Sequence, residues 1–217
     1  MTRAIISFDT ELSAGLYQRG ADARANFESS ILGRCRDGDF GINFQMDMLE
    51  RHGLTGVFFI DPMPALVYGP EVIDAMVPPV IARGHEVQVH IHTEWVPFAR
   101  FNPVGRLTGR NIGDFPLAAQ KKLIALARDI LMGAGAPKPT AFRAGNFGAN
   151  DDTLRALAAL GFRFDSSFNG AYQGHGCDIS LDAGNLGMRT HHGVCEVPVS
   201  GLMDTASRFR PAQLCAM

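Results

Sequence analysis

The sequence has no long apolar run. No segment of its 217 residues approaches the about 18 consecutive apolar residues that a membrane-spanning helix requires. Basic residues are not in excess either, because 20 Lys and Arg stand against 22 Asp and Glu and give a formal net charge of -2. This balance argues against a nucleic-acid partner. No signal peptide is recognisable, because the chain enters a strand-like run almost at once, so we expect a cytoplasmic protein without a membrane span.

Cysteine is scarce and widely spaced. Cys35, Cys177, Cys195 and Cys215 form no Cys-x-x-Cys pair, so the sequence predicts free thiols in a reducing compartment. The sequence also lacks a glycine-rich phosphate-binding loop and a Gly-x-Ser-x-Gly motif. Nothing therefore supports a nucleotide-phosphate site or an esterase nucleophile of the α/β-hydrolase type.

The apolar fraction, in contrast, is ordinary for a globular protein. With 46% apolar and 19% charged residues, the chain can bury a substantial core, and no repeat or domain boundary divides it. We therefore expect one domain over residues 1–217. The final apolar run, 213–217, is typical of the middle of an element, so we expect this domain to be truncated at its C-terminal end.

Short apolar strand candidates alternate with helical patterns. Strands are predicted at 4–8, 57–60, 86–92, 140–143, 162–164 and 196–199. Helical spacing appears in 42–49 and 123–130, and a third helix should begin with Asn150 as N-cap and end at Gly161. This alternation indicates an α/β fold with parallel strands and outer helices. Residues 12–39 and 95–114 lack a pattern and predict long loops that carry substrate contacts or form lids.

Carboxylate and imidazole side chains lie at the ends of two predicted strands. Asp9 and Glu11 follow the first strand, His90 and His92 end the third, and Glu94 comes two residues later. Residues two apart on a strand share a face, and the carboxyl ends of parallel strands meet at one edge of a sheet. Imidazole and carboxylate together suit a first-row divalent ion. The sequence therefore predicts a metal site at this edge.

Each of these residues also has an ordinary structural interpretation. His90 and His92 could be hydrogen-bonded histidines of the interior, and Asp9 and Glu11 could be solvated acids at a strand end. Two carboxylates at one edge repel each other unless a cation or a proton lies between them, which favours the metal interpretation. Arg143 follows another predicted strand and is either a surface arginine or a partner for one of these carboxylates.

The other histidines give weaker signals. His175, His191 and His192 lie in glycine-rich irregular sequence, which predicts surface histidines and not metal ligands. His52 and His85 flank predicted helix ends and are interpreted as structural.

Taken in order, several segments resemble the NodB-like polysaccharide deacetylases, carbohydrate esterase family 4. The sequence Ser-Phe-Asp-Thr-Glu at 7–11 is similar to the family's first motif, usually Thr-Phe-Asp-Asp-Gly. Residues 84–90 are similar to the Gly-His-Glu-x-x-x-His that leads into the second motif. Segments 55–60, 142–145 and 161–167 resemble the family's second strand, its Arg-x-Pro motif and the segment before its fourth motif. The resemblance spans nearly the whole chain and implies a distorted, incomplete (β/α) barrel of the polysaccharide deacetylase type.

The chain departs from the family pattern at three points. The family's second motif is His-x-x-x-His, and this chain has Glu94 at the position of the second histidine, so either Glu94 or His92 supplies that ligand. The Arg-x-Pro motif has no proline after Arg143. The last motif, a histidine that acts as general acid, has no match before Met217.

The resemblance implies hydrolytic removal of an N-acyl group, most typically N-acetyl, from an amino sugar or polysaccharide. A divalent metal, with Zn²⁺ expected, would be held by Glu11, His90 and His92, with Glu94 as the alternative to His92. The metal would activate a water molecule and polarise the acyl carbonyl. Because imidazole is the commoner zinc ligand and His92 needs no turn to face the site, we favour His92, with Glu94 fixing its tautomer.

The resemblance also implies roles for two further residues. Asp9 would act as general base, and Arg143 would hold Asp9 ionised and oriented. Two alternatives stay open: a metal-dependent amidohydrolase acting on a small C–N substrate, and a catalytically inactive carbohydrate-binding relative. The sequence does not define the oligomeric state.

Overall fold

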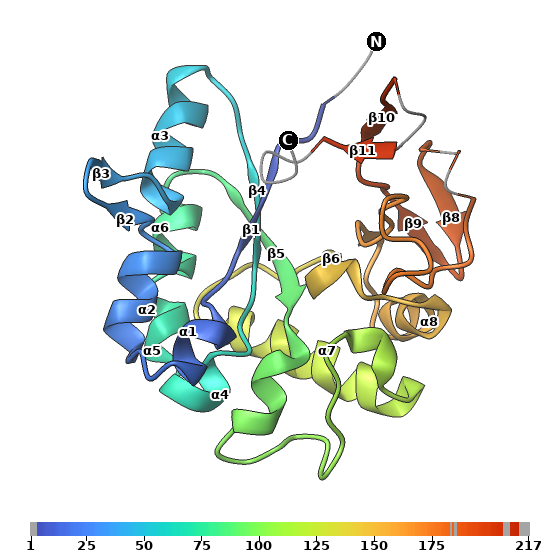
Figure 1. Cartoon of the computed structure of the whole chain (residues 1–217), viewed down its shortest axis with the longest axis horizontal. Coiled ribbons are helices and arrows are strands. Elements are labelled where there is room, and N and C mark those ends of the chain that lie inside the picture. Colours follow the sequence, from blue (N-terminus) through green and yellow to red (C-terminus); the bar gives the residue numbers. More distant parts are fainter. Residues whose placement is uncertain (1–3, 183, 185, 206–208, 213–217) are drawn as a thin grey trace.

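The fold is built around one mixed sheet flanked by helices (Figure 1). The computed structural model describes residues 4–182, 184, 186–205 and 209–212. Seven strands form the sheet in the order β1-β4-β5-β6-β7-β9-β8, and neighbouring strands pair parallel except β8 and β9, which are antiparallel. The strands are β1 (Ser7–Thr10), β4 (Val57–Ile60), β5 (Glu86–Ile91), β6 (Ala141–Ala144), β7 (Phe164–Asp165), β8 (Arg189–His191) and β9 (Val194–Glu196).

Helices α1 to α6 gather on one flank of the sheet, whereas α7 and α8 lie on another (Figure 1). The α-helices are α1 (Ala14–Gln18), α2 (Ala23–Ser30), α3 (Ile42–Arg51), α4 (Ala65–Tyr68), α5 (Glu71–Asp74), α6 (Val77–Ala82), α7 (Leu117–Gly133) and α8 (Asp151–Ala159). The short 3-10 helices are η1 (Thr93–Phe98), η2 (Ile112–Asp114) and η3 (Gly145–Phe147). Two small hairpins are formed by β2 (Arg34–Cys35) with β3 (Gly38–Asp39) and by β10 (Gly201–Met203) with β11 (Phe209–Pro211).

The predicted alternation of strands and helices is confirmed, with shifts at the strand ends. The first strand begins at Ser7, not Ala4, because its pairing with β4 begins where Ser7 lies opposite Val57. Strand β7 begins and ends later than 162–164, and β9 begins two residues before the predicted 196. The central strands are buried on both faces, as expected when helices cover a parallel sheet.

The predicted helices also form. Helix α3 buries Ile42, Met46 and Leu49, the apolar residues that indicated it. Asn150 caps α8, since its side chain accepts a hydrogen bond from the Thr153 N–H at 3.0 Å. After this helix, Gly161 adopts a φ of 80°, a conformation that glycine tolerates best.

The predicted loop over residues 12–39 is wrong, because this stretch contains α1, α2 and the β2–β3 hairpin. The side chains of Ser13 and Asp22 cap the two helices, accepting from the N–H groups of Leu16 and Ala25. Within helix α2 only Asn26 is fully buried, and the apolar residues that pack against the core, Ala23 and Phe27, are partly buried, so the periodic signal is weak. Asn26 instead accepts from the Ser13 N–H at 2.9 Å and donates to the Ser13 carbonyl at 2.8 Å.

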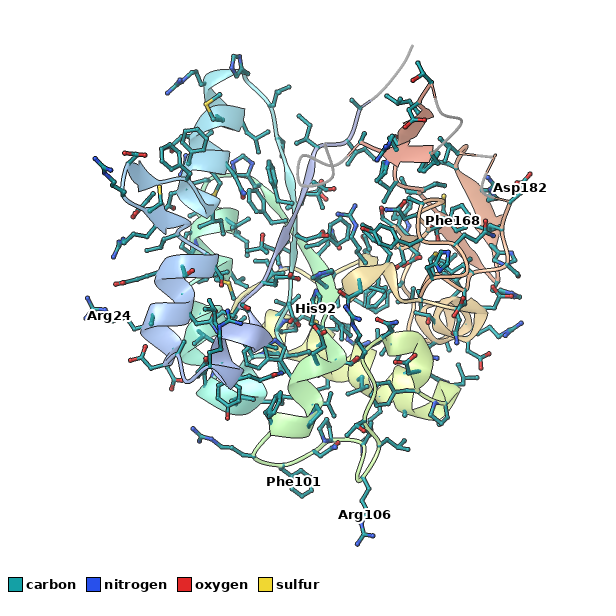
Figure 2. All side chains as sticks on the ribbon, in the orientation of Figure 1. Arg24, His92, Phe101, Arg106, Phe168 and Asp182 are labelled. Atoms are coloured by element: carbon teal, nitrogen blue, oxygen red, sulfur yellow. The ribbon has the colours of Figure 1, made fainter. Side chains whose placement is uncertain are left out.

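The second unpatterned stretch is closer to its prediction. Helices η1 and η2 occupy its two ends, and the loop between them carries Phe101 and Arg106 away from the body of the molecule (Figure 2). Trp95, at the start of the stretch, is fully buried and packs against the rings of Tyr17 and Tyr68.

The sheet does not close on itself within the described residues, because β1 and β8 are its two ends and do not pair. The mostly parallel α/β class is therefore as predicted, and the distorted, incomplete barrel stays a prediction, since no closure is seen among the described residues. Cys35, Cys177 and Cys195 are free thiols, while Cys215 and the run 213–217 lie outside the described residues. Across the described ranges, we find no helix with the length and apolarity needed to cross a membrane.

Candidate metal centre and active site

Glu11, His90 and His92 converge at the carboxyl ends of β1 and β5. The Oε2 atom of Glu11 lies 2.9 Å from His90 Nε2 and 2.5 Å from His92 Nε2. All three residues offer a ligand atom within 4.8 Å of the others. His90 lies on β5, and His92 is the first residue beyond it, with extended φ and ψ of -101° and 106°. The strand geometry therefore carries both imidazoles to the same side, as the two-residue spacing predicts.

The second nitrogen of each imidazole is also held. His90 Nδ1 lies 2.8 Å from the carbonyl oxygen of Arg143, and His92 Nδ1 lies 3.0 Å from Glu94 Oε2. When Nδ1 donates to such an acceptor, the Nε2 atom of a neutral imidazole carries the lone pair. In the absence of an ion both Nε2 atoms donate to Glu11 Oε2, and a cation that displaced these protons would meet the Nε2 lone pairs of rings already held through Nδ1, as metal-binding histidines usually are.

The pKa values of the cluster reflect these contacts. Burial raises the pKa of Glu11, but hydrogen bonds from His90 and His92 and the charges of both rings hold it well below its usual range. Burial lowers the pKa of His90 and His92, but the neighbouring carboxylates outweigh it, and the pKa of His92 rises to about 10. Protons on these rings balance the charge of Glu11, and a divalent cation would displace them.

Arg143 binds Asp9 beside this cluster. Arg143 Nη1 donates to Asp9 Oδ1 at 2.6 Å, and its Nη2 donates to the hydroxyls of Ser7 and Ser166, both at 3.0 Å. Its Nε donates to the Ser166 carbonyl at 3.2 Å, and its guanidinium lies 4.2 Å from the ring centroid of Phe59. These contacts fix the guanidinium plane, so one oxygen of Asp9 is held while its carboxylate faces the site.

Glu94 lies outside the cluster of possible ligand atoms. It accepts from Nδ1 of His92, on the opposite edge of the ring from Glu11, and its other oxygen lies 3.6 Å from Arg110 Nε. The His92 hydrogen bond is the largest influence on the pKa of Glu94 and lowers it. In this geometry Nε2 of His92 points to Glu11, whereas Glu94 contacts Nδ1 of the same ring.

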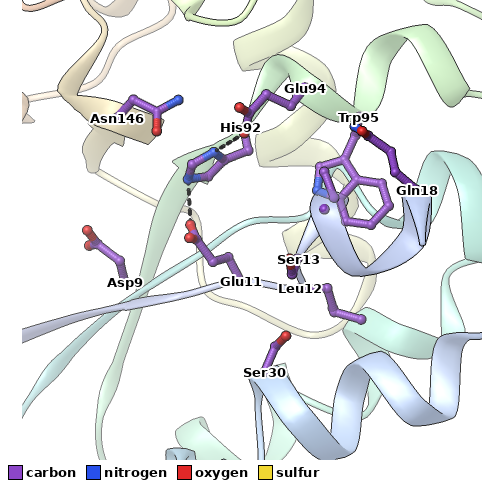
Figure 3. Close-up of a pocket in the computed structure, with 12 residues that line it drawn as sticks. Asp9, Glu11, Leu12, Ser13, Gln18, Ser30, His92, Glu94, Trp95 and Asn146 are labelled. Carbon is purple, nitrogen blue, oxygen red and sulfur yellow. Dashed lines mark hydrogen bonds and ion pairs between the residues drawn. The ribbon is translucent and has the colours of Figure 1, made fainter. Parts of the chain in front are cut away.

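A cavity of about 590 Å³ opens at this cluster (Figure 3). Carboxylates, small residues, amides, an imidazole and an indole surround it: Asp9, Glu11, Leu12, Ser13, Ala14, Gly15, Gln18, Ser30, His92, Glu94, Trp95 and Asn146. Its volume lies in the range of small-molecule sites, which is roughly 300–1,000 Å³. Helix α1, in the stretch predicted to be a loop, thus contributes to the wall, and Asn146 does so with a left-handed φ of 56°.

Asp61 is a residue of this region that sequence reasoning missed. It follows β4 directly, as Asp9 lies at the end of β1, so its place after an apolar strand could have revealed it. Its side chain is fully buried, with one oxygen accepting from the Met63 N–H at 3.0 Å and the other without a hydrogen-bond partner. Burial raises the pKa of Asp61 to about 6, and the charges of His92 and His90 oppose this rise.

The remaining histidines lie elsewhere. His85 is buried and accepts from the Gly56 N–H at 3.2 Å, which agrees with its structural interpretation. His52 and His175 are exposed. His191 and His192, predicted to be surface residues, are instead partly buried and both contact Asp151.

Sequence comparison finds no matching protein-family model and no matching curated protein. Solved structures do match. A protein named as a polysaccharide deacetylase from Mycobacterium smegmatis matches with a TM-score of 0.56 and 19% identity, over 90% of this chain and 58% of that chain. The family 4 carbohydrate esterase from Streptomyces lividans gives 0.43 and 15%, over 76% and 63% of the two chains. The chitin deacetylase from Colletotrichum lindemuthianum gives 0.38 and 14%, over 70% and 64%.

The likeness to the Mycobacterium smegmatis structure shows that this chain shares its fold, a mixed α/β architecture around a mostly parallel sheet. At 19% identity, the likeness concerns the fold alone. The chain spans less than two thirds of these three structures, with 58%, 63% and 64% of their lengths covered.

Proposed function

We propose that this chain is a metal-dependent hydrolase that removes an N-acyl group, typically acetyl, from an amino sugar or polysaccharide. The observation that carries the proposal is the convergence of Glu11, His90 and His92 beside the Asp9–Arg143 pair at one cavity. The fold shared with a polysaccharide deacetylase structure supports it. In this proposal the sheet is part of an incomplete barrel in a single domain.

The donor set fits a zinc-type ion. One carboxylate oxygen and two imidazole nitrogens are common ligands of catalytic zinc, which keeps a further position for water or substrate. The Nδ1 contacts to the Arg143 carbonyl and to Glu94 supply the outer hydrogen bonds that such ligands need. When bound, the ion would supply Lewis acidity to the acyl carbonyl and lower the pKa of water.

The residues of this chain have distinct roles in the proposal. Asp9 takes the proton of the attacking water, because its carboxylate borders the cavity and is not among the converging ligand atoms. Arg143 orients Asp9 through the hydrogen bond from its Nη1 to Asp9 Oδ1. His92 and Glu11 bind the ion, and Glu94 holds the His92 ring in the tautomer that leaves Nε2 free.

The cavity lining suits a substrate rich in hydroxyl groups. Ser13, Gln18, Ser30 and Asn146 offer neutral hydrogen-bonding groups, and Trp95 adds an indole ring to the lining. Among the described residues, no lysine or arginine lines the cavity, so recognition would depend on neutral polar contacts and on the carboxylates. A sugar with an N-acetyl group matches this chemistry.

A second candidate is a hydrolase of a small amide that is not a sugar. The observation in its favour is the limited volume of the cavity, about 590 Å³, with Trp95 as the one Phe, Tyr or Trp among its described lining residues. Both candidates use the same metal cluster and the same base. They differ in the substrate that fills the cavity.

The test combines metal binding with product release. Purified protein is loaded with Zn²⁺ and incubated with N-acetylated chito-oligosaccharides or with a panel of small cyclic and linear amides, and released acetate or amine is measured. Acetate release from the oligosaccharides that disappears in His92→Ala supports the proposal, whereas turnover of the small amides alone supports the second candidate. Zinc binding without turnover of either class would indicate an inactive binding protein.

A further inference from the structure

A second group of metal-type ligands lies away from the cavity, where the β8–β9 hairpin meets the start of α8. Asp151 is the first residue of α8, and His191 and His192 end β8 and begin the hairpin turn. Asp151 Oδ1 lies 3.3 Å from His191 Nε2, and Asp151 Oδ2 lies 3.1 Å from His192 Nε2. The ligand atoms of the three residues all lie within 4.8 Å of one another.

The carboxylate of Asp151 is held in place by a neighbouring loop. Ser180 donates its backbone N–H to Asp151 Oδ1 at 2.9 Å and its hydroxyl to Oδ2 at 2.5 Å. Both oxygens are therefore fixed while both face an imidazole. The three side chains are 22–26% exposed, with 24% for Asp151, so water could complete the coordination of an ion from outside.

The hairpin turn brings the two imidazoles together at some conformational cost. His191 pairs with Val194, so His192 and Gly193 form a two-residue turn with φ of 45° and 87°. A non-glycine residue at positive φ is uncommon. Consecutive residues of a regular strand point to opposite faces. The positive φ of His192 instead brings its ring to the same side as the His191 ring, with 4.2 Å between the two ring centroids.

We propose that Asp151, His191 and His192 form a second divalent-cation site, suited to Zn²⁺, which fastens the β8–β9 hairpin to α8. Two imidazole nitrogens and one carboxylate oxygen form the same donor set as the Glu11 cluster. The site does not border the cavity, so its role is structural. It does not depend on the proposed hydrolase function.

One neighbouring cation opposes binding. Arg155 Nη2 lies 3.4 Å from His192 Nε2, and its guanidinium would repel an ion at that nitrogen. Arg155 is also paired through Nη1 with Asp152 Oδ1 at 2.6 Å, and it is 48% exposed, so it can move toward Asp152 and solvent. An ion pair of Asp151 with protonated histidines is the competing interpretation, and a direct count of bound ions separates the two.

The experiment counts Zn²⁺ ions per chain by calorimetry and elemental analysis, using the full chain at micromolar protein. We compare the wild type with three variants: His90→Ala/His92→Ala, His191→Ala and His192→Asn. Asparagine is used at 192 because it tolerates the positive φ of the turn. His175→Ala, at an exposed histidine outside both clusters, is the matched control.

The expected result is two ions in the wild type and control, and one ion in each variant. Zinc should also raise the melting temperature of the double variant His90→Ala/His92→Ala. Adding His191→Ala to this double variant should abolish the increase, because the remaining ion is bound at the hairpin. Melting curves in chelator verify that each variant is folded. The proposal would be overturned if the wild type binds one ion and loses it in His90→Ala/His92→Ala. It would also be overturned if a second ion is retained in both His191→Ala and His192→Asn. A single ion lost only in the hairpin variants would support this site and refute the other.

Discussion

Arg143 and Asp9 are joined by a 2.6 Å contact between Nη1 and Oδ1, although their strands are not neighbours in the sheet. Strands β4 and β5 lie between β1 and β6, and adjacent strands are about 4.8 Å apart. In a flat sheet this separation would be more than the two side chains can bridge. The contact therefore requires the sheet to curve, and the same curvature brings Glu11, beyond β1, to His90 on β5.

Replacing Arg143 with lysine should destabilise the protein. Lysine keeps the charge but lacks the planar fork that contacts Asp9, Ser7 and Ser166 together. We expect the free energy of unfolding to fall by about 1–3 kcal/mol in urea denaturation. The matched control is Arg24→Lys, whose side chain is 86% exposed and whose ion pair should change stability by less than about 0.5 kcal/mol. Equal losses in both variants would contradict the central role of Arg143.

Replacing Asp9 with asparagine should separate base catalysis from metal binding. Because Asp9 is outside the cluster of ligand atoms, the variant should keep its Zn²⁺ stoichiometry. Acyl release should fall at least about 100-fold, the lower range for loss of a general base. Asp129→Asn, at a 61% exposed position, is the control and should behave like the wild type. Loss of the ion in Asp9→Asn would instead make Asp9 a ligand and exchange its role with that of Glu11.

His92→Ala and Glu94→Gln should differ in their effect on metal affinity. His92 offers Nε2 to the cluster, so its removal should abolish zinc binding at this site at micromolar concentrations. Glu94 contacts only the far nitrogen of the ring, and Glu94→Gln should weaken binding by roughly 10–100-fold. Glu71→Gln, an exposed glutamate, serves as control in the same calorimetric titration. If Glu94→Gln loses the ion and His92→Ala retains it, the assignment of His92 is wrong.

The pH dependence of stability should report on two buried carboxyls, Asp165 and Glu196. Both are fully buried, and Glu196 accepts from the Phe168 N–H at 3.0 Å. Burial raises the pKa of both groups, and the adjacent Asp165 carboxyl raises that of Glu196 further. An acid whose pKa is raised by folding binds more protons in the folded state, so the folded protein loses stability as pH rises above the unfolded pKa of about 4.3.

Glu196→Gln should therefore reduce the pH dependence of the free energy of unfolding. The amide keeps the oxygen that accepts from Phe168 and supplies a neutral donor for Asp165. We expect urea denaturation between pH 5 and pH 8 to show a gain of about 1–3 kcal/mol at pH 8 and a smaller change at pH 5. Glu71→Gln should leave the slope unchanged. A uniform shift of stability at all pH values would show that the two carboxyls are not protonated by burial.

The sequence by itself determined the elements with strong local signals. Apolar runs predicted the central strands, because a strand buried on both faces is apolar at successive positions. Helical spacing predicted α3, α7 and α8, because a helix buried on one side has apolar residues three or four positions apart. The two-residue spacing of His90 and His92 likewise predicted a shared face, since alternation along a strand depends only on local backbone geometry.

Tertiary structure decided what has no local pattern. Helix α2 combines a buried, hydrogen-bonded Asn26 with only two partly buried apolar residues, Ala23 and Phe27, so its periodic signal is weak. The meeting of His191 and His192 with Asp151 joins residues about forty positions apart through a turn whose geometry no spacing rule specifies. The curvature that joins Arg143 to Asp9 is a property of the whole sheet, because strand twist accumulates across neighbours and no single segment encodes it.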